Sequence, residues 1–254
     1  MKIIISPAKR MRYFESNLID TTTPYFIKEA QFLASFMKTL SVNELVDAFK
    51  CSRKIASTTF DMYQDFENES NSSPAILAYN GIQYLTMAPQ VFNNDEIHYV
   101  NSHLYILSGL YGALRPYDSI MPYRLDFESN IKINHNLSLL NYWDSKIYDY
   151  VFKNDSVVLN LASNEYRKLI SPFLKPTEQF IDVFFYEMID HKIIEKSVYV
   201  KEARGAMVRF LASINANTID DVKRFSYRGY HFNEELSNDK KIVFIRKENE
   251  NVTD

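Results

Sequence analysis

Cysteine and glycine are scarce in this sequence, and their scarcity excludes several classes of protein. Cys51 is the only cysteine among 254 residues, so the chain can form neither an internal disulfide nor a thiolate zinc cluster. The five histidines show no spacing typical of a zinc site, and we expect neither a metal nor a cofactor. With only five glycines and eight prolines, the chain also lacks a long flexible linker, which favours a single domain over residues 1–254.

Long apolar runs are absent as well. The N-terminal sequence MKIIISPAKR has only three consecutive apolar residues after Lys2, which is too few for the core of a signal peptide. No later segment approaches the roughly 20 apolar residues of a membrane-spanning helix. We therefore expect a cytoplasmic protein with no membrane partner.

Positive charge is not in excess overall but is concentrated in one segment. The formal net charge is −3, so the molecule as a whole does not attract nucleic acid. Residues 201–228 contain six cations and three acids, which gives this segment a local charge of +3. Any affinity for phosphate must therefore come from a local basic site on a mildly acidic protein.

The chain does contain a large hydrophobic fraction, 46%, arranged in runs typical of buried strands. Four such runs are the N-terminal KIIIS, AILAY at 75–79, LYILSG at 104–109 and SVVLNLA at 156–162, and segments with helical spacing separate them. Four more candidate strands follow Pro176, namely QFIDVFFYEMI, KIIEKSVYV, RFSYRGYHF and KIVFIR, with a helix at about 203–215. We expect the sheet to continue antiparallel in this last part. The pattern predicts a single α/β domain in which helices flank a mixed sheet.

A small helical insertion is predicted at about residues 24–66. Its three segments are PYFIKEAQFLASFMKTL, SVNELVDAFK and SRKIASTTFDMYQDF. Ser41 followed by Glu44 matches a capping box, so the second helix is expected to begin there. At the other end of the chain, the polar tail at about residues 248–254 is expected to be frayed.

Two of the five glycines lie in one stretch, LSGLYGALRPYDSIMPYRLDF at residues 107–127. A buried strand runs directly into Gly109 and Gly112, which allow a sharp turn or a close approach of the backbone to a ligand. We expect both glycines at the edge of an anion-binding cleft, with Arg115 as a bidentate clamp. The alternative is a tight turn in which Arg115 pairs with a surface carboxylate.

Polar and basic residues also follow other predicted strand ends, where ligand crevices form in open α/β sheets. Asn160 and Ser163 end the strand VVLNLAS, and Ser163 is also the expected N-cap of the next helix. Each cation taken alone is typical of a solvated surface, but together the cations predict one basic cleft. The candidate anion-binding residues are Lys9, Gly109, Gly112, Arg115, Arg124, Asn160, Ser163, Lys201, Arg204 and Arg209.

Standard enzyme signatures are missing, since the sequence has no GxSxG elbow, P-loop or dinucleotide fingerprint. Its motifs taken together instead resemble those of the YaaA family of bacterial peroxide stress proteins. The resemblance rests on ISPAK, LSGLYGALRPYDSIMPYRL, YWDSKI, LNLASNEY, ARGAMVRF and GYHFNEE, which occur in this order over nearly the whole chain.

The resemblance implies a cytosolic α/β protein that binds DNA in a basic cleft and limits hydrogen peroxide damage by restraining free iron. It also implies a helix-hairpin-helix element, which would fall on VNELVDAFKCSRKIASTTF, with Lys50, Arg53 and Lys54 at or just after the turn. Such elements usually turn through a glycine, where this sequence has FKCS. Because no helix shows a face of base-reading side chains, we expect binding of double-stranded DNA without sequence specificity.

The leading hypothesis is therefore a non-enzymatic DNA-binding stress protein. The alternative is an enzyme that acts on a nucleotide or another phosphorylated small molecule in the same cleft. In that case Arg115, Arg124 or Lys201 would hold the anion, and Glu165 or Asp118 would serve as acid or base. A third interpretation assigns the motifs to the stability of the fold and the function to a protein partner.

Overall fold

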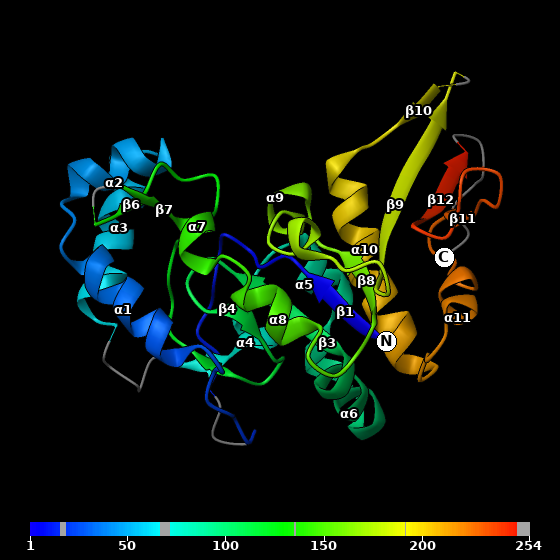
Figure 1. Cartoon of the computed structure of the whole chain (residues 1–254), viewed down its shortest axis with the longest axis horizontal. Helices are drawn as coiled ribbons and strands as arrows, with labels where there is room; N and C mark the ends of the chain where they lie inside the picture. The colour runs from blue at the N-terminus through cyan, green and yellow to red at the C-terminus, as the bar shows by residue number, and fades with distance from the viewer. Residues whose placement is uncertain (16–18, 67–71, 135, 191, 248–254) are drawn as a thin grey trace.

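A mixed eight-stranded sheet forms the centre of the structure, a computed structural model that describes residues 1–15, 19–66, 72–134, 136–190 and 192–247 (Figure 1). The strands follow the order β11-β12-β9-β8-β1-β3-β4, and β10 pairs with β9. Their bounds are Lys2–Ile5 for β1, Leu104–Ser108 for β3, Gly112–Leu114 for β4, Val157–Leu161 for β8, Gln179–Ile189 for β9, Lys192–Ile194 for β10, His231–Phe232 for β11 and Lys241–Lys247 for β12. The predicted α/β class, with a mixed sheet flanked by helices, is confirmed.

Strand β1 occupies the middle of this sheet because its sequence is apolar on both faces. Ile3, Ile4 and Ile5 are all fully buried. β1 pairs in parallel with β3 on one side and with β8 on the other. The chain therefore leaves β1 toward β3 and later returns to the opposite side as β8. In open α/β sheets, such a reversal opens a crevice beyond the carboxyl ends of the strands.

The strands beyond β8 combine both orientations. β9 pairs in parallel with β8 and with β12, whereas β10 and β11 are antiparallel. The expected antiparallel continuation is therefore wrong for the long β9–β12 contact. This contact is parallel because the helix α10 (Ser197–Ser213) forms a crossover between the two strands.

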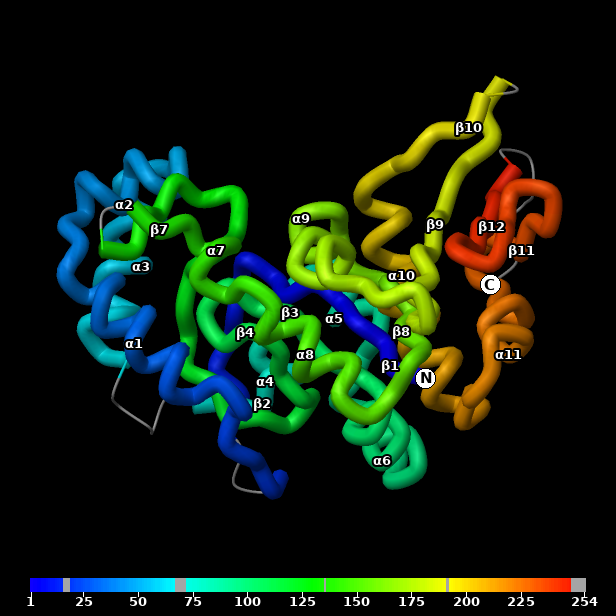
Figure 2. The backbone as a smooth tube through the Cα atoms, viewed as in Figure 1, coloured from blue at the N-terminus to red at the C-terminus, as the bar shows by residue number. Residues whose placement is uncertain are grey.

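Helices from the predicted insertion lie at one end of the molecule (Figure 1, Figure 2). The predicted capping box is confirmed, since Ser41 Oγ accepts from the Glu44 N–H and the Glu44 carboxylate accepts from the Ser41 N–H. A two-stranded sheet, β6 with β7, and the helix α7 lie at the same end. The bounds here are Ile27–Lys38 for α1, Val42–Phe49 for α2, Arg53–Gln64 for α3, Lys132–Ile133 for β6, Leu137–Ser138 for β7 and Leu139–Trp143 for α7.

The remaining helices cover the two faces of the main sheet. In Figure 1, α8 lies on the viewer's side, and α10 packs with α5 and α6 behind the sheet. Gly205 permits the close packing of α10 on α5, because a Cβ at this position would meet the Gln83 carbonyl group. None of the helices in the described ranges is both long and apolar enough to span a membrane. The bounds are Ile82–Met87 for α5, Asn94–His103 for α6, Lys146–Val151 for α8, Asn164–Arg167 for α9 and Ile219–Lys223 for α11, and two 3-10 helices span Pro89–Val91 and Ser171–Phe173.

Three of the predicted strands need correction. The segment AILAY forms the short helix α4 (Ala75–Ala78), which follows β2 (Ser73–Pro74), the partner of β5 (Ser119–Ile120). A short run of buried apolar residues has no periodicity that separates a buried strand from a buried helix. The segment KIIEKSVYV is divided between β10 and the start of α10, and RFSYRGYHF contributes only β11. The tail at 248–254 lies outside the described residues.

Candidate functional site

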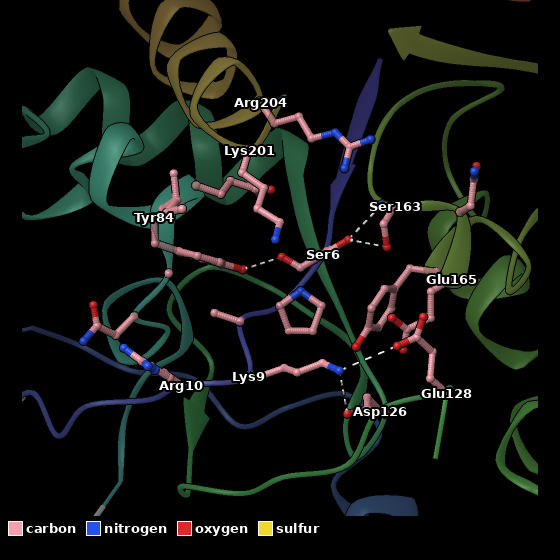
Figure 3. A pocket seen from close by; sticks show the side chains of 18 of the residues that line it. Ser6, Lys9, Arg10, Tyr84, Asp126, Glu128, Ser163, Glu165, Lys201 and Arg204 are labelled. Carbon is pink, nitrogen blue, oxygen red and sulfur yellow. Dashed lines mark hydrogen bonds and ion pairs between the residues drawn. The ribbon is translucent and has the colours of Figure 1, made fainter. Parts of the chain in front are cut away.

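A pocket of about 850 Å³ lies beyond the carboxyl ends of β1 and β8, where the order of connection reverses. Segments that are far apart in the sequence form its walls (Figure 3). The lining residues are 6–10, 80–85, 123–126, 128, 163–166, Phe184, Glu195, Lys201 and Arg204. The pocket thus brings together six of the predicted site residues, namely Lys9, Arg124, Ser163, Glu165, Lys201 and Arg204.

Two serines join the ends of β1 and β8 at the centre of the pocket. The Ser163 N–H donates to Ser6 Oγ at 2.9 Å, and the two hydroxyl oxygens lie 3.3 Å apart. The Tyr84 hydroxyl of α5 donates to the Ser6 carbonyl at 2.8 Å. The helix α9 begins after Ser163 as predicted, but the Ser163 hydroxyl makes no capping hydrogen bond and contacts Ser6 instead. These bonds fix three walls of the pocket relative to one another.

One side of the pocket is basic. Lys201 and Arg204 project from α10 toward the pocket (Figure 3). Arg204 Nε, Arg124 Nε and Gln83 Nε2 are buried and have no hydrogen-bond partner among the described residues. Burial lowers the pKa of Arg204, because the charged guanidinium loses solvation. Buried donors without acceptors destabilise a folded protein, so these three groups mark places where an acceptor from a ligand would be stabilising.

The other side of the pocket is acidic. Lys9 Nζ lies 3.4 Å from Asp126 Oδ2 and 3.6 Å from Glu128 Oε2, and Glu165 Oε1 accepts from the Phe127 N–H at 2.8 Å. Burial raises the pKa of Glu165, and the charges of Asp126 and Glu128 raise it further. The described residues hold no group of three or more ligands arranged to bind a metal ion. Lys9 pairs with two carboxylates on this side, whereas Lys201 and Arg204 lie on the opposite side (Figure 3). Glu195 also lines the pocket, and its charge acts on Arg204.

The wall that contains Arg124 is fastened to the helices α2 and α3. The Arg124 guanidinium lies 5.4 Å from the centre of the Phe49 ring, at the end of α2. The Tyr63 hydroxyl of α3 donates to the Arg124 carbonyl at 3.0 Å, and the Asn130 N–H donates to the Ala48 carbonyl at 2.9 Å. These contacts couple the two helices to the pocket, so a displacement of α2 or α3 would also displace the wall that contains Arg124.

The two glycines of the stretch 107–127 do not line the pocket. A Cβ on Gly109 would meet the Leu125 carbonyl, and the Trp143 indole N–H donates to the Gly109 carbonyl at 2.9 Å. Gly112 has a φ of +71°, and its Cβ would lie 2.7 Å from the Trp143 ring. The expected position of Gly109 and Gly112 at the edge of the cleft is wrong, because close packing inside the protein is what requires them.

Arg115 and Asp118 lie outside the pocket and pair with each other. Arg115 Nη2 donates to Asp118 Oδ1 at 2.8 Å, and the Arg115 N–H donates to Asp118 Oδ2 at 2.8 Å. The Thr22 hydroxyl also donates to Asp118, which is fully buried, and burial raises the pKa of this carboxyl. These bonds fix a tight turn. The alternative interpretation, in which Arg115 pairs with a carboxylate at a turn, therefore fits, except that this carboxylate is buried and not on the surface.

Asn160 and Arg209 also lie outside the pocket. Asn160 Nδ2 donates to Asp182 at 2.7 Å, and Asn160 Oδ1 accepts from the Ala162 N–H at 2.9 Å. Both bonds stabilise the end of β8, which places Ser163. Arg209 belongs to α10, like Lys201 and Arg204, but it lies farther along the helix and does not reach the pocket.

The turn between α2 and α3 is built without glycine. Lys50 adopts a φ of 45°, in the left-handed region that favours glycine. Ser52 then caps α3 by accepting a backbone hydrogen bond at 3.4 Å. Arg53 donates to Asn43 Oδ1 of α2 at 2.9 Å. Lys50, Arg53 and Lys54 are all exposed at this turn and do not line the pocket.

Sequence reasoning missed several residues of the pocket, among them Arg10, Gln83, Tyr84 and Asp126. Arg10 and Asp126 belong to the motifs SPAKR and YRLDF, so their proximity to Lys9 and Arg124 was a usable signal. Gln83 and Tyr84 gave no signal, because α5 reaches the pocket only through its tertiary packing on α10.

Comparison with known proteins finds relatives over nearly the whole chain. Residues 1–236 match the family model described as peroxide stress protein YaaA. The chain belongs to the YaaA family. It is 40% identical over 247 residues to a UPF0246 protein of Agathobacter rectalis, a match that covers 97% of this chain and 99% of the relative. It is 39% identical over 248 residues to a UPF0246 protein of Pediococcus pentosaceus, with 98% and 99% covered. The sequence resemblance is thus confirmed, and this YaaA family member is associated with peroxide stress.

Proposed function

We propose that this YaaA family member binds double-stranded DNA without sequence specificity in the cytoplasm and so limits iron-driven damage during peroxide stress. The family supports the link to peroxide stress. The charge distribution and the geometry of the helices α2 and α3 support the contact with DNA.

The turn at Lys50 is the observation that carries this proposal. Its left-handed conformation brings the chain directly into α3, whose first N–H groups have no acceptors within the helix. A helix N-terminus attracts phosphate, and three exposed cations surround this one, Lys50, Arg53 and Lys54. In the described part of the chain, Lys50 and Lys54 have no carboxylate within ion-pair distance. The turn therefore offers both backbone donors and free charge to a phosphate.

Contacts of this kind recognise the phosphate backbone and carry no sequence information. The net charge of −3 means that the rest of the molecule adds no general attraction for DNA. Binding should consequently be modest, local and strongly dependent on salt.

A salt titration with two duplexes of equal length and different sequence tests the proposal. Fluorescence anisotropy should give equal affinity for both duplexes. The logarithm of the association constant should fall linearly with the logarithm of salt concentration, with a slope of about −0.9 for each phosphate neutralised. A flat dependence on salt, or a strong preference for one duplex, would overturn the proposal.

A pair of double variants locates the contact. Arg53→Ala with Lys54→Ala removes two cations at the turn, and we expect about tenfold weaker binding and a salt slope smaller by about 2. Lys223→Ala with Arg224→Ala is the matched control, because it removes two neighbouring exposed cations of α11, at the opposite end of the molecule. Equal losses in the two double variants would contradict a specific role of the turn.

A further inference from the structure

We infer that the pocket binds a single nucleoside monophosphate unit, with the phosphate against Lys201 and Arg204 and the donor groups of the base or sugar against the carboxylates. This inference concerns the pocket beyond β1 and β8. If the bound nucleotide is part of a DNA strand, this inference depends on the proposed DNA binding. If the nucleotide is free, the inference is independent of it.

Unpaired donors on residues that line the pocket favour a ligand there. Gln83 is only 7% exposed, and its amide Nε2 has no partner among the described residues. Arg204 Nε and Arg124 Nε are likewise buried and unpaired, and both residues line the same pocket. Proteins rarely leave buried donors unsatisfied, and here the three residues that carry such donors all line one cavity. Acceptor oxygens of a ligand would satisfy them.

The polarity of the pocket narrows the chemistry of this ligand. In the described part of the chain Lys201 and Arg204 form no ion pair within 4 Å, although the charge of Glu195, which also lines the pocket, acts on Arg204. Two cations against one carboxylate favour an anion at this side. On the opposite side, Lys9 pairs with Asp126 and Glu128, and together with Glu165 this side still holds three carboxylates. These carboxylates would accept hydrogen bonds from amino or hydroxyl groups (Figure 3). The ligand therefore carries an anion at one end and hydrogen-bond donors at the other, as a nucleotide with an amino-bearing base does.

The size and the aromatic lining of the pocket fit the same class of ligand. A volume of about 850 Å³ accommodates a molecule larger than a bare phosphate ion. Four aromatic residues line the pocket, and of these Phe184 is only half-buried, whereas Tyr84, Tyr123 and Tyr166 are buried. An aromatic ring of this kind can contact the face of a base. A base-paired duplex is too wide to enter, so a nucleotide from DNA must first be unstacked.

Calorimetric titration of the full chain with dAMP, inorganic phosphate and 2′-deoxyadenosine tests the inference. We expect dAMP to bind at least about tenfold more tightly than either fragment, because only dAMP engages both sides of the pocket. Phosphate binding as tight as that of dAMP, or no binding of dAMP, would overturn the inference.

Two arginines of the same helix provide a matched pair of variants. Arg204→Gln should weaken dAMP binding about tenfold or more, whereas Arg209→Gln, also on α10 but outside the pocket, should leave it unchanged. Lys201→Ala provides a second variant if Arg204→Gln fails to fold, since Lys201 is exposed. Equal affinities of the Arg204 and Arg209 variants would overturn the assignment of the phosphate.

Competition separates the two sources of the nucleotide. Displacement of dAMP by a single-stranded oligonucleotide supports the site and identifies an unpaired nucleotide of DNA as its ligand. Binding of dAMP without such displacement supports the site and identifies a free nucleotide. Arg53→Ala with Lys54→Ala should weaken duplex binding without changing the affinity for dAMP, so failure of the proposed function and failure of this inference are distinguishable.

Discussion

The two basic regions of this molecule hold their cations in opposite ways. At the turn between α2 and α3, Lys50 and Lys54 are exposed and remain solvated. In the pocket, Arg124 and Arg204 are partly withdrawn from solvent, and each has a buried Nε without a partner. A solvated cation costs the fold almost nothing, whereas a buried and unpaired cation destabilises it. The comparison shows that exposure alone does not distinguish a DNA contact from ordinary surface, while unsatisfied burial points to a binding site.

The largest predicted loss of stability comes from a substitution at Gly109, which packs against the wall of the pocket. Gly109→Ala should lower the free energy of unfolding by about 3 kcal/mol, because the new Cβ would meet a backbone carbonyl, that of Leu125, which cannot move without displacing Arg124 and Asp126. Denaturant unfolding measures the change. Gly81→Ala is the control with a smaller expected loss, since its Cβ would lie 3.0 Å from the side chain of Ala8. Wild-type stability of Gly109→Ala would show that this contact does not position the wall.

Removal of the buried charge in the pocket should raise stability. Arg204→Met should increase the free energy of unfolding by about 1 kcal/mol, because a partly buried guanidinium whose Nε has no partner is replaced by an apolar chain. The gain should not depend on pH in the ordinary range, since arginine stays protonated there. Thermal unfolding of Arg204→Met and of Lys201→Met, the exposed control, provides the measurement. A lower Tm for Arg204→Met would mean that packing of the arginine outweighs its desolvation.

Glu165 should make the free energy of unfolding of the protein depend on pH. Its pKa is raised in the folded protein, so the stability that protonated Glu165 contributes is present below its ordinary pKa and is lost as the pH rises through the folded pKa. Glu165→Gln keeps an acceptor for the Phe127 N–H and removes the charge. This variant should be more stable than the wild type at neutral pH, by on the order of 1 kcal/mol at most, and equal to it below about pH 4.

Unfolding curves at several pH values test this dependence. Glu235→Gln is the control, because Glu235 is exposed and does not line the pocket. A difference between Glu165→Gln and the wild type that persists unchanged at low pH would contradict an effect of ionisation.

The smallest effect on stability is expected at the turn. Arg53→Ala with Lys54→Ala removes solvated charge and one surface hydrogen bond from Arg53 to Asn43, so Tm should change by only about 1–2 °C. Calorimetric melting measures this change. A large decrease of Tm would show that Arg53 and Lys54 stabilise the fold. The turn would then not differ from the pocket in the way described above.

The sequence predicted those parts of the fold in which local pattern and burial agree. The three isoleucines of β1 and the strand 157–161 were recognised because continuous β-branched runs are typical of buried parallel strands. The segment 75–79 is equally apolar, yet it is helical, because tertiary packing and not periodicity decides the conformation of so short a run.

The candidate site was predictable where strand ends carry polar residues. Ser163 and Lys9 follow β8 and β1 and meet because those strands are neighbours in the sheet. Arg115 looks equivalent in the sequence, but its carboxylate partner Asp118 lies only three residues away and holds it elsewhere. Gln83 could not be predicted, because only the packing of α5 against Gly205 places it in the pocket.

The central position of β1 has a consequence for synthesis on the ribosome. Ile3 lies opposite Leu104 on one side and Leu159 on the other, so the first strand to be made cannot complete either pairing until much of the chain exists. At the usual rate of elongation, β1 waits roughly 8–30 s for β8. Throughout that interval the three consecutive isoleucines lack at least one of their two partner strands, which leaves apolar backbone open to aggregation.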